Sequence, residues 1–288
     1  MLFIANQSEL NMVKPVRTIN YDLSKPDKVY TLPSILYEIS GITEINASSI
    51  ACVQDENGIL FIYDLIKEQI RKQKYFFYSG DYEGIARVDK EIFILRSDGM
   101  LFKITDYEAA NLSPQSYSTG IQAKETEGLC FDPKGNRLLI APKDYVGKKS
   151  ENKNKRVIYG FNLRTKKLVE EPVFIIDLSD IKKFAFENKI KVPMDKDKKK
   201  DEKKPIIEFR ASAIGIHPIT NKLFVLSGME RLLFVFNMNG EIEYMEKLDS
   251  DLFKQAEGIT FLKNGDMLIS NEGQKKKATL LRFNYLKE

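Results

Sequence analysis

A short phrase recurs five times along the chain at nearly constant spacing, and it limits the possible folds more than any other feature. Successive copies begin 43, 44, 85 and 45 residues apart. Self-similarity at a fixed period of this length is typical of proteins built from stacked structural repeats. The five copies begin at Ser40, Glu83, Glu127, Ser212 and Glu257.

The residues that follow each copy also repeat. A turn comes next, then an apolar run, a polar turn, a third run and a weaker fourth run, as in 92–95 and 100–104 of the second repeat. Short runs separated by turn residues indicate antiparallel strands. Four strands in a unit of about 40–50 residues is the spacing of β-propeller blades. The sequence therefore predicts an all-β propeller of four-stranded antiparallel blades.

The number of blades depends on the long interval of 85 residues, which could contain one additional blade. Only one set of four runs fits there, ending at Asp177. The remainder, 179–205, is interpreted as a short N-capped helix followed by a Lys-rich loop insertion that is too polar to bury. We therefore expect five blades, with six as the alternative.

The termini are expected to close the ring. The last blade shows only three strand-like runs, so residues 28–32 are predicted to supply its outer strand and to remove an open seam. Residues 1–27 are then expected to form an N-terminal arm, and residues 28–288 a single propeller domain.

Composition argues against several classes of function. The chain has 45 Lys and Arg against 41 Asp and Glu, and its basic residues are concentrated in two loops, so no nucleic-acid partner is expected. No run approaches the roughly 18 apolar residues of a membrane span. Cys52 and Cys130 lie in apolar runs and are predicted to be buried free thiols. The single histidine, His217, argues against a multi-histidine zinc site. We expect a monomer.

The repeated phrase predicts an incomplete ring of carboxylates at one mouth of the channel, because the first strand of a blade runs beside that channel. Glu83, Glu127 and Glu257 form this ring, and serine occupies the other two positions. Two carboxylates about 4 Å apart repel by roughly 4 kcal/mol at an effective dielectric near 20. A proton, a cation or a basic neighbour must relieve that repulsion.

Ca²⁺ is the candidate cation because it prefers oxygen ligands. Two alternatives stay open: the glutamates bond main-chain amides of the adjacent blade, or they act directly in catalysis. The loops on the same face are expected to supply ligand-binding residues. These are Ser40, Asp55, Glu56, Asp81, Arg96, Asp98, Glu125, Lys143, Asp144, Arg210, Ser212 and Glu272.

Four segments resemble signatures of the SdiA-regulated, YjiK-like family of bacterial propellers. They are 81–85, 125–133, 221–227 and 255–259, and the resemblance extends over roughly 28–286. It implies a propeller in the bacterial cell envelope, periplasmic or lipid-anchored, with calcium held near the glutamates and no established activity. Ser40, Ser212 and the Lys-rich insertion depart from the family pattern.

These observations favour a non-enzymatic envelope propeller that binds a polar ligand, a glycan or a protein at its acidic mouth. The first alternative is a calcium-dependent hydrolase of the phytase or lactonase type. In that case Arg96, Lys143 and Arg210 would hold an anionic substrate against the metal. The second alternative is a structural scaffold whose faces only present loops.

Overall fold

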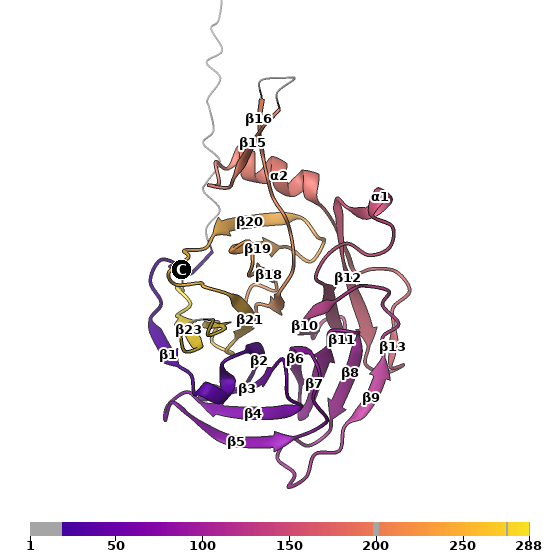
Figure 1. Ribbon diagram of the computed structural model, residues 1–288, viewed down its shortest axis with the longest axis vertical. Coiled ribbons are helices and arrows are strands. Elements are labelled where there is room, and N and C mark those ends of the chain that lie inside the picture. Colours follow the sequence, from indigo (N-terminus) through magenta and orange to yellow (C-terminus); the bar gives the residue numbers. More distant parts are fainter. Residues whose placement is uncertain (1–18, 198–201, 275, 288) are drawn as a thin grey trace, which may run out of the picture.

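The computed structural model is an all-β propeller with five blades around a central channel (Figure 1). It describes residues 19–197, 202–274 and 276–287. The predicted five-bladed architecture is confirmed, and the six-bladed alternative is wrong. The interval of 85 residues holds one blade, α2 and a two-stranded hairpin.

Each blade begins at the channel and adds its later strands outward by antiparallel pairing. Blade 1 contains β2 (Ile39–Asn46), β3 (Ser49–Gln54), β4 (Ile59–Asp64) and β5 (Gln69–Tyr75). Blade 2 contains β6 (Tyr82–Val88), β7 (Glu91–Arg96), β8 (Met100–Ile104) and β9 (Gln115–Ser118). Blade 3 contains β10 (Thr126–Asp132), β11 (Arg137–Pro142), β12 (Lys155–Asn162), β13 (Lys167–Leu168) and β14 (Phe174–Asp177). Blade 4 contains β17 (Ala213–Ile216), β18 (Leu223–Ser227), β19 (Leu232–Phe236) and β20 (Ile242–Lys247).

Blade 5 is closed by the N-terminal strand, as predicted. Its order is β21 (Ala256–Phe261), β22 (Met267–Asn271), β23 (Thr279–Phe283) and β1 (Lys28–Thr31). The register runs from Lys28 opposite Arg282 to Thr31 opposite Thr279. The chain just before β1 also packs on the ring, because Tyr21 and Leu23 are buried in the cluster between blades 4 and 5.

The first strands surround the channel in the order β2, β6, β10, β17 and β21, and each contacts the next. Their close approach explains the glycines of the repeated phrase. A Cβ on Gly84 would lie 2.8 Å from Glu127 O, and one on Gly258 would lie 2.8 Å from Ser40 O. A larger residue would therefore force neighbouring first strands apart.

Five apolar clusters hold the blades together, and each cluster lies between two neighbouring blades. Alternating strand residues supply both sides of every seam, which is why nearly all of β3, β18 and β22 is buried. Cys52 and Cys130 are buried free thiols, as predicted. No helix among the described residues is long and apolar enough to cross a membrane.

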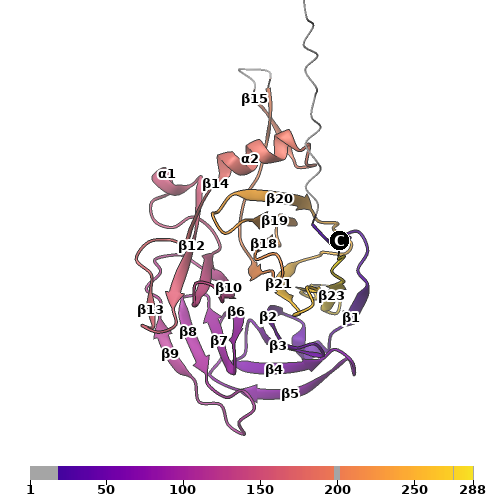
Figure 2. The same ribbon diagram turned by 180° about the vertical axis from the view of Figure 1, so that it is seen from behind.

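The insertion lies at the outer edge of the ring, beyond β20 (Figures 1 and 2). Helix α2 (Leu178–Glu187) starts at Asp177, whose side chain accepts a hydrogen bond from Ser179 N at 2.8 Å. The helix buries Leu178, Ile181 and Ala185 against blades 3 and 4. Strands β15 (Met194–Asp197) and β16 (Glu202–Pro205) then form a hairpin. The remaining helical turns are η1 (Ser34–Leu36) and α1 (Lys149–Asn152).

Candidate functional site

The three glutamates of the repeated phrase lie at β-bulges. The pairing with the second strand shifts between Tyr82 and Gly84 in β6, and equivalent shifts occur around Glu127 in β10 and Glu257 in β21. A bulge leaves one residue unpaired and changes the direction of its side chain. All three glutamates line one narrow space in the channel, of about 10 Å³.

Burial and repulsion between carboxylates keep protons on two of these carboxyls, Glu83 and Glu257. Burial, followed by the charges of Glu127, Asp81 and Glu257, raises the pKa of Glu83 to about 9. Burial and the charges of Glu127 and Glu272 raise the pKa of Glu257 to about 8. At neutral pH the mouth therefore carries fewer negative charges than its composition suggests.

Lys143 is the basic group that contacts the glutamate ring. Its Nζ lies 2.5 Å from Glu127 Oε1 and 3.0 Å from Glu125 Oε2. Burial lowers the pKa of Lys143, but the two carboxylates outweigh burial and the net pKa is raised. Burial alone would raise the pKa of Glu127 further, and contact with Lys143 limits it to about 7. The same lysine lowers the pKa of Glu125.

A second layer of carboxyls surrounds the ring on the side of blades 1 and 5. Burial, then the charges of Asp55 and Glu38, raise the pKa of Glu272 to about 7. Burial, then Glu38 and Glu56, raise the pKa of Asp55 to about 6. Asp55 Oδ1 is buried and has no hydrogen-bond partner in the described part of the chain. The structure thus brings together eight predicted residues: Asp55, Asp81, Glu83, Glu125, Glu127, Lys143, Glu257 and Glu272.

The two serines in the ring positions tie neighbouring blades together. Ser40 Oγ donates to Tyr82 O at 2.5 Å, and Ser212 Oγ donates to Ala256 O at 2.8 Å. Bonding of this kind to the adjacent blade was one of the alternatives for the glutamates. In the described structure it belongs to the serines.

The remaining predicted residues have other partners. Arg96 pairs with Asp98 at 2.7 Å, and Asp144 pairs with Arg156 at 2.6 Å. Arg210 pairs with Glu208 and Glu230, and Glu230 is a residue that the sequence analysis missed. The main-chain N of Glu56 donates to Gln54 Oε1 at 2.6 Å. The cations expected to hold an anionic substrate are therefore already neutralised.

Beside the glutamate mouth lies a cavity of about 180 Å³, with Glu125, Lys143, Tyr145 and Arg210 in its wall. Lys143 connects this cavity to the ring, because it lines the cavity and contacts Glu127. Within the described ranges, no three carboxylate, histidine or cysteine side chains are arranged as a ready-made metal site. A bound cation would therefore require the glutamate side chains to adjust.

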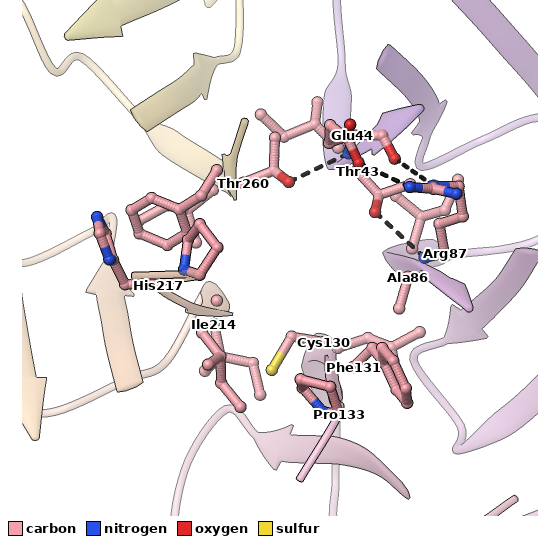
Figure 3. Close-up of a pocket in the computed structure, with 18 of the residues that line it drawn as sticks. Thr43, Glu44, Ala86, Arg87, Cys130, Phe131, Pro133, Ile214, His217 and Thr260 are labelled. Atoms are coloured by element: carbon pink, nitrogen blue, oxygen red, sulfur yellow. Dashed lines mark hydrogen bonds and ion pairs between the residues drawn. The ribbon is translucent and has the colours of Figure 1, made fainter. Parts of the chain in front are cut away.

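The opposite mouth of the channel opens into a larger cavity, of about 240 Å³, that the sequence analysis did not foresee (Figure 3). Five aliphatic side chains line both this cavity and the glutamate space, so they lie between the two. Each comes from the third position of the repeated phrase, a regularity that could have revealed a plug across the channel. The plug consists of Ile42, Ile85, Leu129, Ile214 and Ile259.

Comparison with known proteins supports the fold and assigns no family. No protein-family model matches the chain, and no curated protein matches it. The crystal structure of the glutaminyl cyclase of Myxococcus xanthus is similar, with a TM-score of 0.61 and 10% sequence identity. The alignment covers 90% of this chain and 95% of the cyclase. At this identity the similarity shows a shared fold.

Two further solved structures have a TM-score of 0.49 and 10% identity, too low to support an argument. The Nidogen/Laminin complex matches over 81% of this chain and 72% of the matched chain. The Mitotic Checkpoint Complex matches over 100% and 99%.

Proposed function

We propose that this propeller binds a polar ligand through a cation held at the glutamate mouth, with Ca²⁺ as the candidate cation. One observation carries the proposal: three carboxyls from three different blades share one space, and two of them, Glu83 and Glu257, hold protons at neutral pH. A divalent cation that displaced those protons would relieve the repulsion among the carboxylates. It would also use the oxygen ligands that Ca²⁺ prefers.

The adjoining cavity gives the rest of the ligand a place to lie. Its wall combines Tyr145 with the charged residues Lys143, Glu125 and Arg210. A glycan or another polyhydroxylated molecule could donate hydrogen bonds to Glu125 and accept them from Lys143, while one of its oxygens coordinates the cation. This arrangement favours a polar ligand over an apolar one.

Calorimetric titration with Ca²⁺ tests the proposal. Because the pKa values of Glu83 and Glu257 are raised to about 9 and about 8, cation binding must release protons, and affinity should increase from pH 6 to pH 9. Repeating the titration in buffers with different ionisation enthalpies counts the released protons. Glu257→Gln should abolish binding, whereas Glu108→Gln, in an exposed ion pair with Arg71, should leave it unchanged. Absence of binding, or equal binding by both variants, would contradict the proposal.

A second candidate is acid–base catalysis at the same mouth. A glutamic acid that keeps its proton near neutral pH can act as a general acid, and an ionised neighbour can act as a base. The similar cyclase structure suggests a reaction to try, the cyclisation of an N-terminal glutamine. In it the α-amine attacks the side-chain amide carbon and ammonia leaves. Ammonia released from a glutamine-initiated peptide, and lost in Glu83→Gln, would support this candidate.

We also propose the bacterial cell envelope as the setting, an expectation that rests on the resemblance to the SdiA-regulated family. Fractionation of cells that produce the full-length protein tests it. Recovery of the protein in the cytosolic fraction would contradict this setting without affecting the proposed ligand site.

A further inference from the structure

The cavity at the mouth opposite the glutamates is separated from them by the aliphatic plug. The five plug side chains are 1–5% exposed, so little water reaches them from either side. The cavity therefore has an apolar floor, and its ligand chemistry is independent of the carboxyls beyond the plug.

The cavity wall has two unlike sides. Figure 3 shows Ile214, Cys130, Phe131 and Pro133 along one side of the ring. The other side carries hydrogen-bonding groups from β2, β6 and β21. There Thr260 Oγ1 accepts from Glu44 N at 3.2 Å, and Thr43 Oγ1 accepts from Arg87 N at 3.2 Å. An occupant should therefore be mostly apolar, with a polar group on one edge.

Two charged groups in the wall, Arg87 and Glu44, neutralise each other. Arg87 Nη2 donates to Glu44 Oε2 at 2.8 Å, and its other nitrogens donate to Glu44 O and Asp89 O. Both ring nitrogens of His217 have partners, Tyr21 Oη on one side and the main-chain N–H groups of 219 and 220 on the other. Burial lowers the pKa of His217 to about 4, which leaves the ring neutral. His217 directly follows β17 and is buried. Lys263 also lines the cavity but is exposed to solvent, so among the described residues the buried part of the wall holds no charged side chain without a countercharge.

One acceptor in the polar side has no partner. Glu44 lines the cavity, and its Oε1 is buried without a hydrogen bond to any group in the described residues. The Glu44 side chain is 11% exposed, so little solvent can satisfy that oxygen. A buried charged acceptor without a hydrogen bond destabilises the folded protein. A ligand that donates one hydrogen bond to this oxygen would remove that destabilisation.

We propose that this cavity binds a small, neutral, largely apolar molecule that donates a single hydrogen bond from an N–H or O–H group to Glu44 Oε1. The apolar body would lie against the plug and the side formed by Cys130 and Phe131, and the donor would face β2. Indole has this chemistry and serves as the probe.

Indole binding can be measured directly because the chain contains no tryptophan. Excitation at a wavelength that tyrosine does not absorb reports only the probe, and its emission should shift to the blue in an apolar site. The matched probe 1-methylindole lacks the N–H group. We expect it to bind at least tenfold more weakly than indole, the loss associated with a hydrogen bond to a charged acceptor.

Glu44→Gln is the matched protein variant. Its amide oxygen can keep the contact with Arg87. Its NH₂ group, a hydrogen-bond donor, then takes the place of Glu44 Oε1, the acceptor without a partner. Indole affinity should fall about tenfold or more, whereas the affinity for 1-methylindole should stay within about twofold. The variant's melting temperature reports whether it folds.

Glu83→Gln lies beyond the plug and should not change indole affinity, whether or not the glutamate mouth binds Ca²⁺. A failure of the calcium titration is therefore distinguishable from a failure here. Absence of a saturable blue shift would overturn the proposal. Equal affinity of indole for the wild type and folded Glu44→Gln would also overturn it, as would equal affinity of the two probes for the wild type. If Glu44→Gln fails to fold, the comparison of the two probes on the wild-type protein decides.

Discussion

Replacing Glu83 by glutamine should stabilise the protein at neutral and alkaline pH. The folded carboxyl has its pKa raised from 4.5 to about 9, because it is buried among other carboxyls. The folded state therefore holds a proton that the unfolded state loses. Between pH 4.5 and pH 9 the unfolded state binds fewer protons at this site, so the free energy of unfolding must fall as pH rises.

The magnitude follows from the size of this window. At pH 7 the unfolded glutamate is about 2.5 pH units above its pKa, and each unit corresponds to about 1.4 kcal/mol. The wild type should thus lose about 3 kcal/mol of stability from this residue between pH 4.5 and pH 7. Glutamine resembles the protonated form and does not titrate. At pH 7 the free energy of unfolding of Glu83→Gln should therefore be about 3 kcal/mol higher than that of the wild type. At pH 4.5 the two free energies of unfolding should be nearly equal.

Urea unfolding in calcium-free buffer from pH 5 to pH 9 measures this difference. A thermal scan at pH 7 should show a melting temperature raised by roughly 6 °C. The matched control is Glu125→Gln, because contact with Lys143 lowers the pKa of that carboxyl and its loss should not stabilise the fold. Parallel stability curves for the wild type and Glu83→Gln, or a less stable variant at pH 7, would refute the reasoning.

Three further substitutions test the mouth, the seams and the closure of the ring. Lys143→Met should raise the pKa of Glu127 above about 7, because it removes the cation that limits this value; carboxyl ¹³C NMR titration measures the change. Ser40→Ala should cost about 1–3 kcal/mol in urea unfolding, because it leaves the carbonyl of Tyr82 without its buried donor. Tyr30→Ala should cost about 3–5 kcal/mol in the same assay, because it empties a buried aromatic site on the closing strand.

The serine and tyrosine changes each have a control. Ser24→Ala removes a hydroxyl from an exposed turn, and Val29→Ala shortens a side chain that is 48% exposed on the closing strand. Both should change stability by less than about 0.5 kcal/mol. A Ser40 or Tyr30 effect no larger than its control, or an unchanged Glu127 titration in Lys143→Met, would contradict the corresponding contact.

The blade architecture was predictable because each blade of a propeller is formed mainly by one contiguous segment of the chain, so the blades appear as repeats in the sequence. Every first strand meets the same crowding at the channel, so the small residue at Gly84 recurs at Gly258, and the turns between strands recur with it. The closing strand was predictable by counting, since blade 5 lacked one partner. The hairpin of β15 and β16 was not foreseen. A polar lysine-rich segment carries no apolar alternation, and pairing between its strands leaves little trace in sequence.

The candidate site was less predictable, because the position of a charged residue in the repeat does not determine which side chain it pairs with. Arg96, Asp144 and Arg210 lie near the predicted rim, yet each forms an ion pair outside the glutamate ring. Such pairs depend on loop conformations that no repeat specifies. Lys143 could be placed at the rim from sequence, but only the structure shows that it contacts both Glu125 and Glu127.

The plug separates the two mouths of the channel, and it affects the properties of both. Its side chains close the channel directly beneath the glutamates, so water reaches the carboxyls from one side only, and burial becomes the largest cause of their raised pKa values. The same side chains form the apolar floor of the opposite cavity. The bulges before Ile85, Leu129 and Ile259 coincide with Glu83, Glu127 and Glu257, which line the acidic mouth, while the residues after these plug positions line the opposite cavity. The same repeated phrase therefore supplies both the carboxyls of one mouth and the apolar floor of the cavity at the other.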